Sequence, residues 1–346
     1  MRALMFEQFQ GPFGVQNVPD PSPSRDGVVI RVKAAGICRS DWHGWQGHDP
    51  DVRVPHIPGH EFAGVVEEIG PEMRRYKPGD RVTVPFAVGC GTCPQCLSGH
   101  QQICDNYFQP GFTAWGCFAE LVAIPHADTN LVTLPDEMGF AESASLGCRF
   151  MTSFRAVVVQ GRVAAGEWVA VHGCGGVGLA AVMIARAVGA QVIGVDVRPE
   201  ALAWAQKLGA AHVLDASSSP QIVETIRELT GGGAHLSLEA LGSRTTCRNS
   251  VECLRKRGRH VQVGLMVADD SNAPVPMNLV IARELEILGS HGMPAHSYGA
   301  VLEMIRAGTL QPQKLVSKTV GLEQAGAELE AMSGFNTLGV TVIDRF

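Results

Sequence analysis

A glycine-rich turn between a strand pattern and a helix pattern constrains the fold of this chain more than any other feature. The run Trp168–His172 is apolar enough for a strand buried inside a parallel sheet. It leads into Gly173-Cys-Gly-Gly-Val-Gly178, which fits G-x-G-x-x-G, and then into an Ala-rich apolar stretch over 179–188. In this order backbone N–H groups and a helix N-terminus can hold a pyrophosphate. We predict a dinucleotide site here, against the alternative of an ordinary glycine turn in an α/β sheet.

The next strand pattern, 191–195, ends in an acidic residue that bears on the choice of cofactor. Asp196 lies eighteen residues after Gly178. A carboxylate at this place accepts hydrogen bonds from the ribose hydroxyls of NAD and repels the 2′-phosphate of NADP. We therefore predict NAD, with NADP less favoured. Arg198 follows two residues later and could pair with a phosphate, which would weaken that preference.

The alternation of strand and helix patterns continues beyond Asp196. Strands are predicted at 212–214, 236–239, 259–263 and 285–288, with helices at 199–208, 220–229 and 245–254. Six strands joined by helical crossovers predict a doubly wound parallel sheet. One more helix, 297–306, and mixed elements follow, and we expect this tail to return to the N-terminal part of the chain.

The N-terminal part has a different pattern, of short β-strands separated by turns. Strand patterns at 28–33, 64–69 and 80–84 surround the turn Lys77-Pro-Gly-Asp80. With 346 residues, 40 glycines and 45% apolar residues, the chain is long enough for two domains with full cores. The fold class is therefore α/β, with a β-rich part and a doubly wound part.

Charge and the start of the chain exclude several partners and locations. The formal net charge is −6 and no long basic run occurs, so neither nucleic acid nor a membrane surface is an expected partner. The first residues lack the apolar core of a signal peptide, and no apolar run reaches about 20 residues. We expect a cytoplasmic protein whose ten cysteines serve as thiols rather than disulfides.

Four of these cysteines have the spacing of a closed zinc site. Cys90, Cys93, Cys96 and Cys104 fall within fifteen residues, so that one loop can wrap a tetrahedron of thiolates. The alternatives are free thiols, two disulfides or an iron–sulfur cluster, although nothing else in the sequence indicates electron transfer. We predict a structural zinc.

A second metal site is predicted from scattered residues. Cys38 and His60 supply a thiolate and an imidazole, with Ser40 and His43 beside them, and Cys148 is the candidate third ligand. Three protein ligands with an open fourth position are typical of catalytic zinc. Such a zinc acts as a Lewis acid on an alcohol or carbonyl oxygen. The alternative is a buried cysteine and a core histidine without metal.

With these motifs in order, the chain resembles a zinc-dependent medium-chain alcohol dehydrogenase over essentially all 346 residues. The motifs are Gly-Ile-Cys-Arg-Ser-Asp-x-His from Gly36, Gly59-His-Glu61, the four cysteines, Gly147-Cys148, the glycine turn and Val263-Gly-Leu265. The resemblance implies a GroES-like β-rich catalytic domain, 1–149 completed by 289–346, and a Rossmann coenzyme domain, 150–288, with the active site between them. It also implies that Cys38, His60 and Cys148 bind the catalytic zinc and that the four clustered cysteines bind the structural one.

The resemblance assigns further roles. Ser40 would take the substrate proton and pass it through the nicotinamide ribose to His43, while Glu61 and Asp41 would orient or tune the metal ligands. Residues expected to contact the cofactor are Arg39, near the pyrophosphate, and Thr152, Gly173, Gly175, Gly176, Val177, Gly178, Asp196, Arg198, Val263, Gly264 and Leu265. Leu338-Gly-Val-Thr341 lacks the basic residue that many relatives carry near this glycine. Cys117, Cys174, Cys247 and Cys253 match no ligand spacing and are expected to be small buried residues.

These features predict an NAD-dependent alcohol dehydrogenase that interconverts alcohols and aldehydes or ketones, with two zinc ions per chain. Competing hypotheses are a zinc-ribbon nucleic-acid binder, which leaves the glycine turn unexplained, and a zinc-free reductase. The substrate is open: a polyol, a formaldehyde adduct or an amino alcohol is the alternative. Trp42, Phe86 and Trp115 are candidates to line an apolar pocket. The resemblance implies a homo-oligomer, with a tetramer favoured over a dimer.

Overall fold

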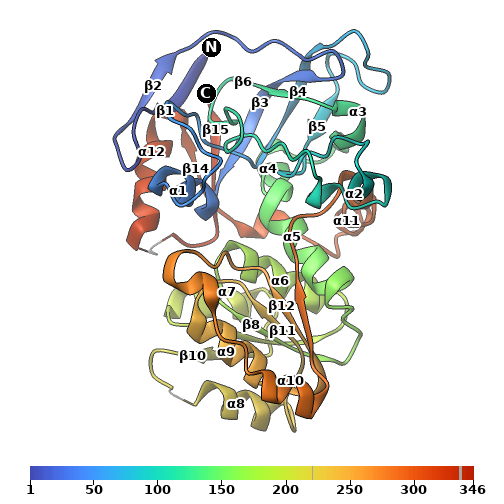
Figure 1. Cartoon of the computed structure of the whole chain (residues 1–346), viewed down its shortest axis with the longest axis vertical. Coiled ribbons are helices and arrows are strands. Elements are labelled where there is room, and N and C mark those ends of the chain that lie inside the picture. The colour runs from blue at the N-terminus through green and yellow to red at the C-terminus, as the bar shows by residue number, and fades with distance from the viewer. Residues whose placement is uncertain (220, 335–336) are drawn as a thin grey trace. The chain divides into compact units, whose positions relative to one another are not determined.

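The chain divides into two compact units. The computed structural model describes residues 1–219, 221–334 and 337–346 (Figure 1). Unit 1 comprises Met1–Met151, Gly292–Ile305 and Gln311–Phe346, and unit 2 comprises Thr152–His291 and Arg306–Leu310. Both ends of the chain therefore belong to unit 1.

Unit 1 is built on a seven-stranded sheet and a two-stranded hairpin. The large sheet has the order β14-β15-β3-β4-β5-β7, and β6 also pairs with β3. The hairpin pairs β1 with β2 in antiparallel register. The strands are β1 (Arg2–Phe6), β2 (Phe13–Asn17), β3 (Val28–Ile37), β4 (Phe62–Ile69), β5 (Arg81–Thr83), β6 (Leu121–Ile124), β7 (Val132–Thr133), β14 (Val316–Gly321) and β15 (Val340–Arg345).

Strand β3 is the centre of this sheet. Its ten residues include the run Val-Val-Ile-Arg-Val, whose β-branched side chains suit a pleated and buried surface. It pairs with β4 along one edge and with β6 and β15 along the other, all antiparallel. The C-terminal strand β15 thus lies against the end of β3 that leads into Cys38.

The helices of unit 1 are mostly short. They are α1 (Arg39–Gln46), α2 (Pro94–Leu97), α3 (Ala127–Asn130), α4 (Phe140–Ala144), α11 (Tyr298–Arg306) and α12 (Leu322–Ala331), with a π-helix at Leu146–Phe150. The core between sheet, hairpin and α12 contains fully buried aromatic rings, among them Phe6, Phe62 and Phe118. The sequence had indicated the β character of this unit but not α1.

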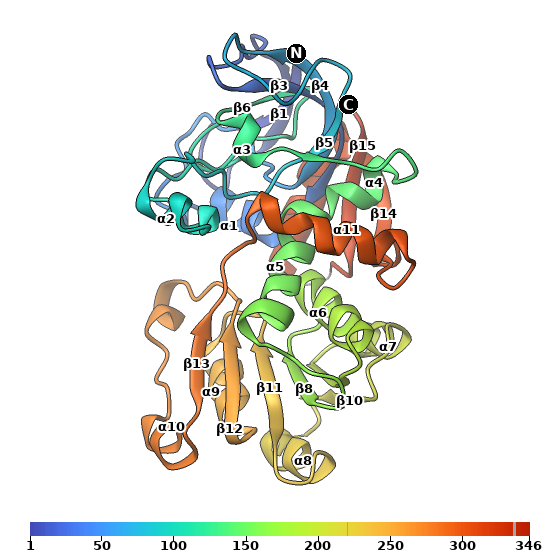
Figure 2. The same cartoon turned by 90° about the vertical axis from the view of Figure 1, so that its right-hand side faces the viewer.

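Unit 2 holds a six-stranded, entirely parallel sheet. Its order is β10-β9-β8-β11-β12-β13, and Figure 2 shows these strands side by side. The strands are β8 (Trp168–His172), β9 (Gln191–Asp196), β10 (His212–Asp215), β11 (Ala234–Glu239), β12 (Leu254–Gln262) and β13 (Glu286–Gly289). The order runs outward in both directions from β8, which confirms the predicted doubly wound sheet.

Helices connect these parallel strands. They are α6 (Gly176–Ala187), α7 (Pro199–Lys207), α8 (Ile222–Leu229), α9 (Arg244–Glu252) and α10 (Met277–Arg283), whereas α5 (Met151–Phe154) and a second π-helix at Arg155–Gln160 precede β8. Predicted helix 220–229 corresponds to α8, but its predicted first residue, Pro220, lies outside the described residues. Helix α10 was not predicted; none of its residues is buried, although Leu279 and Val280 pack against the core of unit 2.

The described residues also bear on two broader expectations. None of their helices combines the length and the apolar character that crossing a bilayer requires. All ten cysteines are free thiols, and Cys117, Cys174, Cys247 and Cys253 are buried, as predicted.

Candidate metal and cofactor sites

Cys38 lies where strand β3 gives way to helix α1. It is the residue that caps the N-terminus of α1, and its backbone N–H donates to Asp41 Oδ2 at 2.9 Å. Asp41 occupies the third position of the helix, where an acidic side chain returns to the cap and also suits the helix dipole. The pattern Cys-Arg-Ser-Asp is thus a helix start, a signal that the sequence analysis missed.

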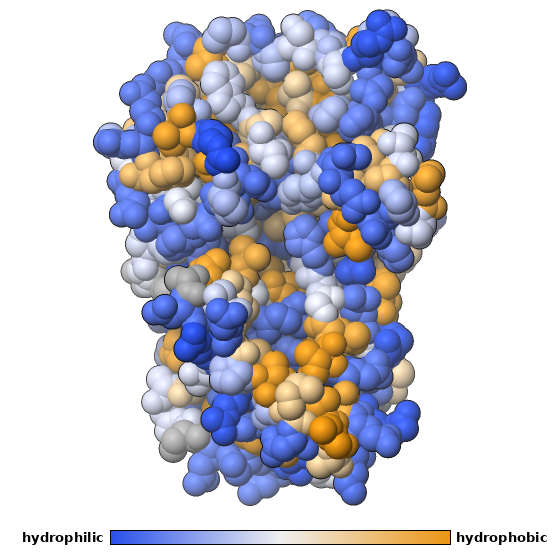
Figure 3. Space-filling view, in the orientation of Figure 1, coloured by the Kyte–Doolittle hydropathy of each residue, from blue (hydrophilic) through white to orange (hydrophobic). Residues whose placement is uncertain are grey.

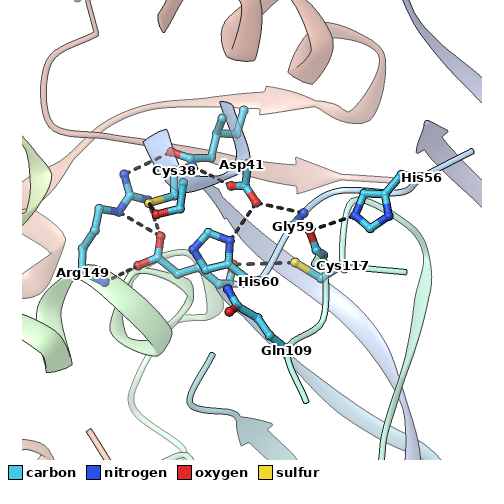
Figure 4. A network of polar contacts seen from close by, with 12 residues as sticks. Cys38, Asp41, His56, Gly59, His60, Gln109, Cys117 and Arg149 are labelled. Atoms are coloured by element: carbon cyan, nitrogen blue, oxygen red, sulfur yellow. Dashed lines mark hydrogen bonds and ion pairs between the residues drawn. The ribbon is translucent and has the colours of Figure 1, made fainter. Parts of the chain in front are cut away.

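The other oxygen of Asp41 fixes His60 (Figure 4). Asp41 Oδ1 accepts from His60 Nδ1 at 2.7 Å and from the backbone N–H of Gly59 at 3.0 Å. This bond leaves Nε2 as the free position of the ring, and Nε2 is buried without a hydrogen-bond partner among the described residues. Although burial opposes a charge, the Asp41 carboxylate raises the pKa of His60 well above its ordinary value. Nε2 is therefore a position where a cation is stabilised.

Cys148 completes a three-residue cluster with Cys38 and His60. It lies in the π-helix Leu146–Phe150, a wider turn of the kind often found at functional sites. One ligand atom from each of the three residues lies within 4.8 Å of the others. Two sulfurs and one imidazole nitrogen are donors that suit zinc, and three ligands leave a fourth position open.

The two thiols of this cluster are electrostatically unlike. A hydrogen bond with Cys148, followed by the Arg149 guanidinium and His60, holds the pKa of Cys38 well below its ordinary value in spite of burial. The same hydrogen bond, together with burial, raises the pKa of Cys148 well above its ordinary value. The sulfurs are thus close enough to share one proton, and a divalent cation needs the same closeness.

Glu61 and Arg149 form a buried ion pair beside the cluster. Arg149 donates its backbone N–H to Glu61 Oε1 at 3.0 Å and Nε–H to Oε2 at 2.9 Å, and its Nη2 also contacts Oε2. Burial raises the pKa of Glu61, although the Arg149 charge opposes the shift. Sequence reasoning predicted a role for Glu61 but missed Arg149, whose partner lies 88 positions away in the chain.

Ser40 and His43 lie on α1. The hydroxyl Oγ of Ser40 is 3.9 Å from Cys38 Sγ. His43 is half-buried, and its Nδ1 lies 3.0 Å from Nδ1 of the exposed His48. Burial, with the charges of Arg39 and His48, lowers the pKa of His43 to about 4. His43 is therefore neutral near pH 7 and can accept a proton. His48 was not predicted from the sequence.

Aromatic rings surround His60. The ring centroids of Phe112 and Phe86 lie 5.3 and 6.1 Å from that of His60, both edge-on. Phe86 was predicted near the site, and Phe112 was not. Trp42 packs against His43, and Trp115 lines a separate surface pocket with Met1 and Phe108.

The four clustered cysteines form the second candidate metal site. Cys90, Cys93, Cys96 and Cys104 bring their sulfurs within 4.8 Å of one another. Backbone N–H groups point at these sulfurs, for example Cys90 N to Cys104 Sγ at 3.2 Å and Cys93 N to Cys90 Sγ at 3.3 Å. Hydrogen bonds from Asn106 and Thr92 lower the pKa of Cys90 to about 5. Burial raises the pKa of Cys96 to about 12 and also raises that of Cys104, so the loop by itself favours the thiolate at Cys90 but not at all four positions.

In unit 2 the glycine turn opens helix α6. Gly173 has φ +94°, a conformation that favours glycine, and a Cβ at Gly178 would lie 1.8 Å from Gly173 O. The helix begins at Gly176, inside the motif, so its first N–H groups point out of the turn. Asp196 Oδ2 accepts from Cys174 N at 2.7 Å and Oδ1 accepts from Arg198 N at 2.9 Å. The acidic residue is thereby fixed beside the turn.

Other predicted cofactor residues of unit 2 follow the same sheet edge. Val263, Gly264 and Leu265 follow β12, and the N–H groups of Val263 and Gly264 donate to Glu239 O at the end of β11. Since β9, β8, β11 and β12 are parallel neighbours, their carboxyl ends lie along one edge. Thr152 Oγ1 is buried without a hydrogen-bond partner among the described residues, and Val177 O accepts from Ser153.

Arg39 belongs to unit 1. Its Nη1 donates to Met332 O at 2.6 Å and its guanidinium lies 4.3 Å from the centre of the Trp42 ring. Its contact with a pyrophosphate stays a prediction, as do the other residue roles.

Comparison with known proteins assigns the chain to a family. Residues 24–136 match the alcohol dehydrogenase GroES-like domain and residues 176–307 match the zinc-binding dehydrogenase domain. The chain is 35% identical over 292 residues to an alcohol dehydrogenase of Geobacillus stearothermophilus, covering 84% of each chain. It is 33% identical over 353 residues to the NAD-dependent alcohol dehydrogenase of Sulfurisphaera tokodaii, covering 99% of each. The solved alcohol dehydrogenase TADH from Thermus sp. ATN1 superposes with a TM-score of 0.91 at 32% identity, over 100% of both chains. With two candidate zinc sites and a Rossmann sheet in place, this chain belongs to the zinc-dependent medium-chain alcohol dehydrogenase family of oxidoreductases.

Proposed function

We propose that this protein catalyses the reversible oxidation of an alcohol to an aldehyde or ketone by hydride transfer to NAD. The observation that carries the proposal is the cluster of Cys38, His60 and Cys148, in which His60 Nε2 is buried and without a partner among the described residues. These donors fit a catalytic zinc, which supplies a Lewis acid for the alcohol or carbonyl oxygen when bound.

The chain's own residues position that chemistry. Asp41 accepts from His60 Nδ1, which fixes the ring so that Nε2 faces the two sulfurs, and it also fixes the backbone of Cys38. A carboxylate that accepts a hydrogen bond from the second ring nitrogen of a metal-bound histidine orients the ring and raises its basicity. Phe86 and Phe112 flank His60 and exclude water from its side of the site.

A proton must also leave during alcohol oxidation. We assign Ser40 as the hydroxyl that takes it and His43 as the base that carries it outward. His43 can deliver a proton from Nδ1 to Nδ1 of His48, whose exposed ring exchanges with solvent. The 3.0 Å contact with His48 supports this assignment; because the pKa of His43 is lowered to about 4, a proton that reaches its ring passes on at once.

The cofactor assignment depends on Asp196. Its carboxylate lies at the glycine turn with an anion-binding helix start beside it, which favours NAD over NADP. Arg198 Nε lies 3.3 Å from Asp196 Oδ1, so the Asp196 carboxylate compensates part of the positive charge of Arg198 within the protein. Asp196→Ala should raise the KM for NAD and narrow the ratio of kcat/KM between NAD and NADP by roughly tenfold. A wild type that prefers NADP would contradict the assignment.

Two zinc ions per chain are proposed, the second held by the four-cysteine loop as a structural ion. Elemental analysis of the purified protein should give about two zinc ions per chain. The absence of zinc would favour a zinc-free reductase.

The substrate class is best supported as an apolar alcohol. The aromatic rings against His60 favour it, whereas a polyol, a formaldehyde adduct or an amino alcohol would need polar partners in the pocket. The deciding experiment is a panel of primary, secondary, aromatic, amino and polyol substrates, each assayed with both nicotinamide cofactors. If the zinc-loaded protein turns over none of these substrates, the proposed function is contradicted.

Assembly into a homo-oligomer is supported by the edge of unit 2. Strand β13 ends the sheet, and Figure 3 shows apolar residues gathered on the face that carries α10. Met277, Ile281 and Ile287 on α10 and β13 are exposed, Ile281 by 78%. Unpaired edges and apolar patches of this kind are typical of interfaces. We favour a tetramer over a dimer, which light scattering can decide, and a cytoplasmic location, which fits ten free thiols.

A further inference from the structure

The buried side chain of Arg149 connects the residues that lie next to the three predicted catalytic zinc ligands in the chain. Ile37 precedes Cys38, Glu61 follows His60, and Arg149 follows Cys148. The guanidinium of Arg149 bonds to the first two of these neighbours and is itself the third. The three segments come from β3, from the start of β4 and from the π-helix, and they are far apart in sequence.

The contacts of Arg149 are specific in direction. Nη1 donates to Ile37 O at 3.1 Å, while Nε donates to Glu61 Oε2 at 2.9 Å and Nη2 contacts the same oxygen. The backbone N–H of Arg149 donates to the other carboxylate oxygen at 3.0 Å. The Glu61 carboxylate is thus held on both oxygens, and the Ile37 carbonyl is bound by the same guanidinium group.

The surrounding backbone leaves space for this arrangement and little more. A Cβ at Gly36 would lie 2.5 Å from Glu61 Oε2 and 2.8 Å from Arg149 Nη2. Gly36 N also donates to Glu61 O at 2.7 Å, which ties β3 to β4 at this point. A glycine is therefore needed where the ion pair crosses β3.

Only an arginine makes all of these bonds. A lysine would keep the charge but could not reach the Ile37 carbonyl and the carboxylate with a planar fork. Buried ion pairs add little net stability, because desolvation offsets the attraction, so stability alone is a weak reason for this one. The position of this ion pair between the three ligand segments gives a second reason for it.

We propose that Arg149 is a positioning residue that holds the Cys38, His60 and Cys148 segments at the spacing required by the metal. The inference rests on the proposed catalytic zinc. Arg149 contacts neither substrate nor cofactor in this role. It acts by limiting how far the three ligands can move apart, and so it slows metal release.

The test measures metal release by a chelator in the full-length zinc-loaded protein. Release should occur in two phases, and the phase that is missing from Cys148→Ser belongs to the three-ligand site. Arg149→Lys should speed that phase by about 10- to 100-fold and leave the other unchanged. Arg31→Lys is the matched control, because Arg31 makes a similar two-bond pair with Glu67 on β3 and β4 but is exposed.

Two further variants separate positioning from folding. Glu61→Gln with Arg149→Met removes both charges, so no unpaired carboxylate stays buried; it should melt near wild type and still release metal faster. Gly36→Ala keeps the pair but displaces it and should give a smaller acceleration, which carries the test if Arg149→Lys does not fold.

A Co²⁺-substituted protein should show a shifted visible spectrum in each variant. Unchanged release in Arg149→Lys, or wild-type retention in the double variant, overturns the inference. A wild type without the three-ligand phase contradicts the zinc proposal instead.

Discussion

The two candidate metal sites lie in the same unit but are built in opposite ways. The four-cysteine site takes all its ligands from one short loop, and backbone N–H groups of that loop support the sulfurs. The three-ligand site takes its donors from segments up to 110 positions apart and is supported by the side chains of Asp41, Glu61 and Arg149. A local site can be complete in itself, whereas an open site must be held by the rest of the fold.

The largest expected effect concerns the open site. Cys148→Ser removes one of the two thiolates, so kcat should fall by roughly 10³-fold while the melting temperature changes little. Steady-state kinetics and thermal unfolding of the same preparation check this, with Cys247→Ala as the control for losing a buried thiol elsewhere. Activity within a few fold of wild type would contradict the mechanism.

The closed site should respond in the opposite sense. Cys104→Ala opens a complete ligand set, so the lobe loses its metal and the melting temperature should fall by roughly 10 °C. The kcat per folded molecule should stay close to wild type at low temperature. Equal stability with and without metal in this loop would mean that the two sites do not divide their roles as proposed.

The proposed proton path lies beside the open site. His43→Gln should slow alcohol oxidation by roughly tenfold near pH 7, because the neutral imidazole is lost as an acceptor. The deficit should shrink at high pH, where hydroxide accepts the proton, and on adding imidazole. His100→Gln, an exposed histidine, is the control. An unchanged pH–rate profile would remove His43 from the path.

The last prediction concerns the stability of unit 2, which contains neither of the two candidate metal sites. His172 is fully buried, and burial together with His260 lowers its pKa to about 3. In the unfolded chain His172 binds a proton near pH 6.5, whereas in the folded protein it does so only near pH 3. The contribution of neutral His172 to the free energy of unfolding is therefore fully present above pH 6.5 and is lost progressively as the pH falls toward 3. The slope is about 1.4 kcal/mol per pH unit for this group. Urea unfolding between pH 7 and 5 should be less pH-dependent in His172→Gln, and a slope equal to wild type would contradict the assignment.

The sequence predicted most strongly what is local in the chain. Strand β8 has the predicted bounds, since its apolar run and the glycine turn lie next to each other. The four cysteines were grouped correctly for the same reason. Helix α6 begins three residues earlier than expected, because the helix starts within the glycine motif itself.

What depends on distant partners could not be predicted. Strand β12 begins at Leu254 rather than 259, because Leu254 pairs with Ala234 of β11 and the register then shifts before Arg259 pairs with Leu236. A buried arginine at position 149 reads as a surface residue until Glu61 is placed against it. Phe112 and His48 likewise gain meaning only from the fold.

The wide turn that carries Cys148 has a consequence for redesign. A π-helical turn holds one residue more than the α-helical turn that the neighbouring residues of α4 and α5 adopt. Sequence optimisation that rewards helix regularity would remove this extra residue and rotate the thiol away from its partners. A redesigned protein could therefore be more regular, fold well and yet have lost its third ligand, so the irregular turn should be kept fixed when this family is stabilised.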